Sequence, residues 1–229
     1  PPRSTLFPYT TLFRSEDKSV LKGGRKYSVI IASRWPMVVI LPSNAALPWP
    51  ERYLSVKVAS PWGSIECHNV HMPAGVSQGD TKPETFEGIY KFLSHHSSQM
   101  RILCGDFNSP KQEFPDMRII TWGKTKRDEY GRLVNDLSDR KARAEHLVFS
   151  GLQEYDLKDV YRQVNGYDRN GSYSWVHKWR DHRTCRRFDH IFASLRLHPI
   201  SCQYHHQFLD LGLSDHAPIF AVFEPRSGS

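Results

Sequence analysis

"ILCGDFNSP", residues 102–110, is the stretch that decides the fold of this chain. Its apolar first residues predict a buried strand, which ends in Gly-Asp-Phe-Asn at 105–108 with Pro110 close behind. Because proline disfavours a helix, the segment predicts a strand that runs into a loop. An acid and an amide at such a strand end serve either a tight turn or chemistry.

The composition predicts a single domain with one large core. The chain has 229 residues, of which 39% are hydrophobic and 12% aromatic, and this is enough to bury such a core. Its apolar stretches, such as residues 37–41, are far shorter than the roughly 20 residues that a membrane-spanning helix needs. We therefore expect a soluble, cytoplasmic monomer without membrane contact.

Cysteine spacing and charge narrow the class of protein further. The four cysteines lie far apart without a CxxC pair, so the sequence signals neither a zinc ribbon nor a disulfide framework. The net charge of +7 favours an anionic partner such as nucleic acid or a phosphorylated ligand. Charge alone does not decide between these two partners.

The first fifteen residues differ from the rest of the chain. The segment "TLFPYTTLFRS", residues 5–15, has turn formers inside apolar pairs and follows neither a helical nor a strand period. Read as codons, it resembles the translation of a short-read sequencing adapter; the alternative is a genuine disordered tail. We expect residues 1–15 to be a non-native artefact and residues 16–229 to be a single domain that lacks its first strands.

From residue 27 onward the chain has the pattern of a mixed α/β domain. The short turn at residues 61–63 predicts a hairpin between its two flanking strands. Alternating or apolar segments bounded by turn residues predict strands at residues 27–33, 37–41, 53–60, 64–70, 101–107, 172–176, 188–194, 201–206 and 218–224.

Two helices are predicted between these strands. Apolar residues recur at i, i+3, i+4 and i+7 from Phe86 to Leu93, on a helix entered through Pro83. A second helix from about Lys141 is expected to end at Gly151 as its C-terminal cap. Irregular alternation of helices and strands predicts sheets, partly antiparallel, with helices packed outside.

Three further segments place polar residues where a strand begins or ends: "HNVHMP" (68–73), "RFDHIFAS" (187–194) and "LSDHAP" (213–218). Taken singly, an Asp or His at a strand end is more often a turn or cap residue. Together the segments supply the parts for phosphodiester hydrolysis: carboxylates for a hard metal ion, a base for water, and donors for negative charge. The set is Asn69, His71, Asp106, Asn108, Asp189, Asp215 and His216.

The order of these motifs is similar to that of the endonuclease/exonuclease/phosphatase superfamily, metal-dependent phosphoesterases that include abasic-site endonucleases and deoxyribonuclease I. The motifs are NxHxP, GDFN, RxDHIxAS and SDHAPI, within about residues 27–224. The resemblance implies a four-layer α/β sandwich, in which two mixed, largely antiparallel sheets pack face to face with helices outside.

The resemblance also implies catalytic roles. Asp106 would orient or deprotonate the attacking water, and Asn108 would hold that water or a phosphate oxygen. Asp189 would pair with His216 and fix the tautomer of an imidazole that contacts the scissile phosphate.

Further roles concern the metal and the leaving group. Asp215 and Asp106 would lie at a Mg²⁺ or Mn²⁺ ion, His71 would face the leaving group, and Asn69 would support the site. Two strands of the superfamily are not found before residue 27: the first strand, which carries an Asn, and the next, Gln-Glu strand, which carries the principal metal carboxylate. We do not assign Glu16 as this metal carboxylate. We therefore expect the chain as given to be inactive or nearly so.

The C-terminal third is similar to the exonuclease III type of abasic-site endonuclease. Trp175 is followed by a predicted loop that is rich in cations, and Arg186 and Arg187 lie at its end. These three residues and Asn69 are the expected substrate contacts, along a DNA backbone. The alternatives are a plain solvated loop, a pseudoenzyme that binds nucleic acid without cutting it, and a phosphatase of small phosphoesters.

Other candidate ligands are assigned structural roles. The adjacent pairs His95–His96 and His205–His206 point in different directions on a strand, which makes them poor joint metal ligands. Glu145, near the middle of the second helix, is expected to be solvated.

Overall fold

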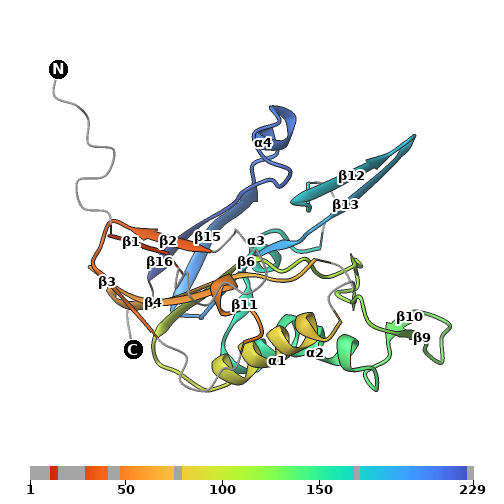
Figure 1. Ribbon diagram of the computed structural model, residues 1–229, viewed down its shortest axis with the longest axis horizontal. Helices are drawn as coiled ribbons and strands as arrows, with labels where there is room; N and C mark the ends of the chain where they lie inside the picture. The colour runs from red at the N-terminus through yellow and green to blue at the C-terminus, as the bar shows by residue number, and fades with distance from the viewer. Residues whose placement is uncertain (1–10, 15–28, 41–46, 75–78, 168–170, 226–229) are drawn as a thin grey trace.

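The computed structural model describes residues 11–14, 29–40, 47–74, 79–167 and 171–225 (Figure 1). The first two residues of the strand expected at 27–33, and Glu16, lie outside these ranges. The strands are β1 (Thr11–Arg14), β2 (Ile30–Ser33), β3 (Met37–Val39), β4 (Tyr53–Ser60), β5 (Gly63–His71), β6 (Met100–Asp106), β7 (Gln112–Glu113), β8 (Ile119–Ile120), β9 (Thr125–Arg127), β10 (Leu133–Asn135), β11 (Lys158–Asp159), β12 (Trp175–Trp179), β13 (His182–Arg186), β14 (Asp189–Ala193), β15 (Leu197–Tyr204) and β16 (Ile219–Pro225). The helices are α1 (Thr81–Leu93), α2 (Arg140–Phe149), α3 (Val160–Asn165) and α4 (Gln207–Asp210), with 3-10 turns η2 (Pro50–Arg52) and η3 (Gly151–Tyr155).

A six-stranded sheet forms the centre, in the order β11-β14-β6-β5-β4-β3. Only β5 and β6 run parallel within it, because α1 connects them by a crossover, and the other neighbours are antiparallel. The predicted hairpin is confirmed as β4 and β5, which pair along their whole length. A mixed, largely antiparallel sheet is thus confirmed.

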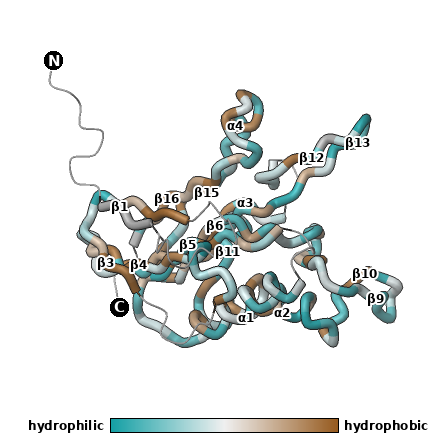
Figure 2. The backbone as a smooth tube through the Cα atoms, in the orientation of Figure 1, coloured by the Kyte–Doolittle hydropathy of each residue, from teal (hydrophilic) through white to brown (hydrophobic). Residues whose placement is uncertain are grey.

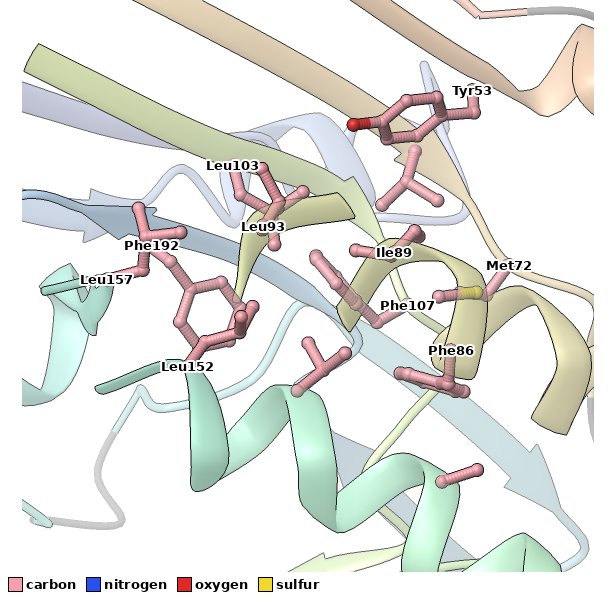
Figure 3. Close-up of a cluster of buried hydrophobic side chains, with 13 residues drawn as sticks. Tyr53, Met72, Phe86, Ile89, Leu93, Leu103, Phe107, Leu152, Leu157 and Phe192 are labelled. Atoms are coloured by element: carbon pink, nitrogen blue, oxygen red, sulfur yellow. The ribbon is translucent and has the colours of Figure 1, made fainter. Parts of the chain in front are cut away.

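Helices α1 and α2 lie side by side on one face of this sheet (Figure 1). The predicted stripe of α1 faces inward, since Phe86, Ile89 and Leu93 are fully buried. They pack toward Phe107 and Phe192 from the sheet side (Figure 3). Each of these aliphatic or aromatic side chains contributes about 1.5–3 kcal/mol by leaving water, so this core holds the end of β6 against the helices.

The opposite face of the sheet carries β15 and β16, which form an antiparallel pair. Side chains of β14, β15 and α3 make a second core there, with Ile191, Tyr204 and Tyr161 among its buried members. The predicted mixed α/β fold, with sheet packed on sheet and helices outside, is therefore confirmed. No helix in the described part of the chain is long and apolar enough to cross a membrane.

Two local expectations differ from the structure. Gly151 does not cap α2; Ser150 does, and Gly151 begins η3 where an added Cβ would lie 3.0 Å from the Tyr90 ring. The basic segment after Trp175 is the hairpin β12–β13 rather than a loop. Residues 11–14 form β1 and pair with β2, and residues 1–10 and 15 lie outside the described chain, so the non-native origin of residues 1–15 stays a prediction.

A buried ion network lies at the start of α3. The Arg187 guanidinium bonds both carboxylate oxygens of Glu113 at 2.7 and 2.8 Å and Oδ2 of Asp159 at 2.6 Å. Arg162 adds a second guanidinium to Glu113 at 2.6 Å. Although burial opposes its charge, the pKa of Glu113 is lowered to about 2 by these two arginines. The network joins β7, β11, α3 and the short segment between β13 and β14.

This network predicts a defined acid sensitivity. A carboxylate whose pKa is lowered by folding stabilises the protein above its unfolded pKa, near 4.5, and loses that contribution as the pH falls toward about 2. We expect Glu113→Gln to lower the free energy of unfolding by about 3 kcal/mol at pH 7, because it leaves Arg187 buried with one partner fewer. The loss of stability between pH 4.5 and 2 should also become shallower, as measured by urea unfolding at each pH.

The matched control is Glu87→Gln, because Glu87 holds Arg140 in an ion pair near the surface. We expect it to change the free energy of unfolding by less than about 1 kcal/mol. Equal losses for the two variants would contradict the role given to the network.

Candidate functional site

The register of three strands brings the predicted polar residues together at one end of the sheet. His71 ends β5 and lies beside Asp106, the last residue of β6. On the other side of β6, Asp189 begins β14 and pairs with Asp106. Residues that are far apart in the sequence thus become direct neighbours, because each stands at the end of a paired strand.

Gly105 lets β6 approach β5 closely just before the acid. Its φ is +132°, and a Cβ built there would lie 2.0 Å from the carbonyl oxygen of Val70. Any side chain at this position would force the two strands apart. This explains why a glycine precedes Asp106 at the end of a buried strand.

Asn108 and His71 contact Asp106. The backbone N–H of Asn108 donates to Oδ1 of Asp106 at 2.8 Å, and its Nδ2 donates to Oδ2 at 2.9 Å. Nε2 of His71 lies 3.7 Å from the same Oδ2. Burial and the neighbouring Asp189 carboxylate raise the pKa of Asp106 to about 7, which suits a group that accepts a proton near neutral pH.

Asp189 and His216 form the predicted pair. Nδ1 of His216 lies 2.6 Å from Oδ2 of Asp189. The segment that carries His216 is placed by a β-bridge to Trp175 and by the bond from Ala217 N to Ser174 O at 2.6 Å. Burial opposes the imidazolium, but the hydrogen bond and charge of Asp189 outweigh it, so the pKa of His216 is raised above 6.5.

The pKa of His71 is shifted in the opposite direction to that of His216. Burial and the nearby Arg52 guanidinium, whose Nη1 lies 3.4 Å from Nε2 of His71, lower its pKa to about 4. The ring is therefore neutral at pH 7 and can act as a hydrogen-bond donor or acceptor. Nδ2 of Asn69 donates to the carbonyl of Ile30 at 2.9 Å and ties β5 to β2. Its expected contact with substrate stays a prediction.

Asp106 and Asp189 could hold a divalent cation, with the His216 imidazole beside them. One ligand atom of each lies within 4.8 Å of the others. The two carboxylates repel each other, since Asp189 raises the pKa of Asp106, and a cation between them would relieve this repulsion. Mg²⁺ commonly binds through one or two carboxylates and keeps several waters, so the donor set fits it. Asp215, expected as a metal ligand, is exposed and does not join this group among the described residues.

The predicted substrate contacts divide into two kinds. The Arg186 guanidinium is partly buried and lies 4.8 Å from the centre of the Trp122 ring and 5.9 Å from that of Trp175. It lines an open cleft of about 470 Å³. Arg187 also lines this cleft, but it is buried and its guanidinium is held by Glu113 and Asp159, so its expected contact with substrate stays a prediction.

Sequence reasoning missed three residues behind the site. Lys82 is buried and Nζ donates to the carbonyl oxygen of Asn108 at 2.7 Å, and Trp122 Nε1 donates to the same oxygen at 2.8 Å. Glu145, expected to be solvated, is 2% exposed, and its Oε1 accepts from the backbone N–H of Trp122 at 3.2 Å. The one available signal was a lysine in the first turn of a helix, where the helix dipole disfavours a cation.

The Asp189–His216 pair makes a measurable prediction. Asp189→Asn removes the carboxylate that raises the pKa of His216 and leaves the burial that lowers it. The pKa of His216 should therefore fall below its value in the parent protein, as followed by NMR titration of the imidazole Hε1 signal. Asp215→Asn should lower it less, because Asp215 is exposed and acts by charge alone. An unchanged pKa in Asp189→Asn would contradict the pairing.

Comparison with known proteins identifies the fold. No family model matches the sequence, and no curated protein matches it. An endonuclease/exonuclease/phosphatase from Beutenbergia cavernae is similar with a TM-score of 0.53 and 21% identity, over 86% of this chain and 47% of that one. The chain thus spans about half the length of that protein.

Two DNA complexes are similar as well. D. rerio TDP2 in complex with a single-strand DNA product has a TM-score of 0.60 and 16% identity, over 94% of this chain and 77% of that one. The 3' phosphatase NExo from Neisseria, bound to a product DNA hairpin, has a TM-score of 0.58 and 20% identity, over 85% of this chain and 74% of that one. The chain has the fold of endonuclease/exonuclease/phosphatase proteins, and the resemblance seen in its motifs is confirmed at that level. The exonuclease III type stays a prediction.

Proposed function

We propose that this protein is a metal-dependent phosphodiester hydrolase that acts on DNA. The observation that carries the proposal is the convergence of Asp106, Asp189 and His216, with ligand atoms within 4.8 Å of one another at the ends of two paired strands. This set combines two carboxylates, one of which serves as the base, with a hydrogen-bonded imidazole. These are the groups that water attack on a phosphate requires.

Each residue of the site has a separate role in the proposed hydrolysis. Asp106 accepts the proton of the attacking water, and Asn108 orients the carboxylate through its two hydrogen bonds. Nδ1 of His216 faces Asp189, so Nε2 is the nitrogen that contacts the phosphate, and its charged form offsets the developing negative charge. His71, neutral at pH 7, lies on the other side of Asp106 and donates toward the leaving oxygen.

Asp106 and Asp189 would hold Mg²⁺ or Mn²⁺ between them. When bound, the ion supplies charge stabilisation to the phosphate oxygens. Two described carboxylates make a small ligand set, so we expect weak ion binding and slow turnover by this chain. Assays therefore need saturating Mg²⁺ or Mn²⁺ and protein in excess over substrate.

The basic cleft favours a nucleic acid over a small phosphoester. It is lined by segments directly next to the site: Lys111 follows Asn108 by three residues, and Arg186 precedes Asp189 by three. Arg183 and Tyr173 form another part of its wall. Cations interleaved with aromatic rings suit a strand with phosphates and stackable bases. The DNA complexes of D. rerio TDP2 and Neisseria NExo support this choice.

The central test is loss of chemistry without loss of binding. Asp106→Asn and His216→Ala should each lower the single-turnover rate of DNA hydrolysis at least about 100-fold, because each removes one acid/base or electrostatic group. DNA affinity should stay within about threefold, because neither change removes a cation of the cleft. A variant that cleaves at the parental rate would refute the role given to its residue.

The same assay separates the alternatives. DNA binding without any hydrolysis by the parent protein at saturating metal would indicate a pseudoenzyme. Turnover of a small phosphoester without salt-sensitive DNA binding would indicate a phosphatase of small molecules.

The cleft makes its own prediction. Arg186→Gln should weaken DNA binding roughly three- to tenfold and reduce the slope of log affinity against log salt by about 1, because one phosphate contact is lost. Lys158→Gln, a change at an exposed lysine on the edge strand β11, is the control and should alter neither quantity. Fluorescence anisotropy with a labelled oligonucleotide measures both. If Arg186→Gln binds DNA with the parental affinity and the parental salt slope, the cleft is not part of the DNA-binding surface.

A further inference from the structure

The carbonyl oxygen of Asn108 is held by two donors from separate parts of the chain. Lys82 Nζ comes from the first turn of α1, and Trp122 Nε1 comes from the segment between β8 and β9, at 2.7 and 2.8 Å. Asn108 itself has φ of +48°, in the left-handed region that residues other than glycine seldom occupy. The two donors fix the orientation of a peptide group whose conformation is intrinsically unfavourable.

This peptide orientation decides where the Asn108 side chain points. Nδ2 donates to Oδ2 of Asp106 at 2.9 Å and to the carbonyl oxygen of Met72 at 3.0 Å. The backbone N–H of Asn108 donates to the other oxygen of Asp106. If the peptide rotated, the side chain would leave both acceptors and Asp106 would lose its orientation.

Lys82 is costly for stability at this place. It is 5% exposed, and its amine lies at the N-terminal end of a helix, where the dipole repels a cation. Burial lowers the pKa of Lys82 to about 8, although the charges of Glu145 and Asp106 act in the opposite direction. A cation kept where folding alone disfavours it points to a role in the site.

Trp122 and Glu145 complete the arrangement. Oε1 of Glu145, buried on α2, accepts the backbone N–H of Trp122 and so fixes the residue whose indole bonds Asn108. The Lys82 amine lies 5.7 Å from the centre of the Trp122 ring, within the range of an attractive cation–ring interaction. Helix α1 thus contacts the Asn108 carbonyl directly through Lys82, and α2 acts on it indirectly, because Glu145 holds the backbone of Trp122.

We propose that Lys82 and Trp122 are positioning residues that hold Asn108 in its left-handed conformation and, through its side chain, aim the Asp106 carboxylate at the attacking water. The proposal rests on the proposed function, because it assigns the two residues to the hydrolytic step. Neither residue needs to touch substrate.

Single-turnover kinetics on a DNA oligonucleotide with saturating Mg²⁺ provide the first arm of the test. Lys82→Met keeps the length of the side chain but removes donor and charge, and we expect the maximal rate constant to fall at least about tenfold. Trp122→Phe removes only the indole donor and should cost roughly threefold. The protein concentration at half-maximal rate should change less than about twofold in both, because binding is not the step affected.

A double-variant cycle shows whether Lys82 acts through Asn108. Asn108→Gly removes the side chain while tolerating the positive φ. In that background, Lys82→Met should change the rate constant less than about twofold, because no side chain is left to aim. A full tenfold effect in the Asn108→Gly background would overturn the proposal.

A second arm does not depend on activity. In ¹⁵N NMR spectra, Lys82→Met should shift the side-chain amide signals of Asn108 and speed hydrogen exchange at the Trp122 indole. Lys91→Met, the same change at an exposed position of α1, should do neither. Unchanged Asn108 signals in Lys82→Met, with or without a lower melting temperature, would overturn the proposal.

The two arms separate the two hypotheses. If the parent protein hydrolyses no DNA, the proposed function is wrong, and the NMR comparison alone decides whether Lys82 holds Asn108. If the parent cleaves and Lys82→Met cleaves equally fast, the function stands and the positioning role is refuted.

Discussion

The close approach of β6 to β5 on one side and its pairing with β14 on the other is the constraint on which the site depends. At Gly105 the backbone of β6 comes so near the Val70 carbonyl that a Cβ would overlap it. This fit brings the ends of β5 and β6 level, and the antiparallel register sets Asp189 opposite Asp106. Because a sheet cannot slip by one residue without turning every side chain over, the two acids are locked as neighbours.

Several groups at and behind this end of the sheet are unfavourable for the stability of the fold. Two carboxylates side by side repel each other, a lysine is buried in the first turn of a helix, and a non-glycine residue is held at positive φ. Each feature opposes folding when taken alone. The aromatic core around Phe107 stabilises the end of β6, and the ion network around Arg187 stabilises the segment that leads into β14. The structure therefore concentrates its unfavourable features where the proposed chemistry needs charge and fixed geometry.

The strand-end residues of the site could be predicted because their signal is local. An apolar run that stops at Gly-Asp marks the end of a strand, and one that follows Phe-Asp marks the start of a strand, so a polar residue at either place lies at an end of the sheet. Asp106, Asn108, Asp189 and His216 converge as expected. Lys82, Trp122 and Glu145 could not be found in this way, because their contacts depend on how α1, α2 and an irregular segment pack on the sheet. Glu145 is expected from the sequence to be solvated because it lies near the middle of a predicted helix, whereas packing buries it next to the Trp122 backbone.

The amino-acid sequence by itself determined the fold class, the positions of the long strands along the chain and most of the groups that meet at the sheet edge. Alternation, turn residues and polar strand ends are short-range features, so they can be recognised along the chain. Only the tertiary structure decided that Arg187 is buried in an ion network while the guanidinium of its neighbour Arg186 lies over the Trp122 ring, and that Asp215 stands outside the acidic cluster of the described residues. The physical reason is that burial and charge pairing are set by elements distant in sequence, which a linear pattern does not bring together.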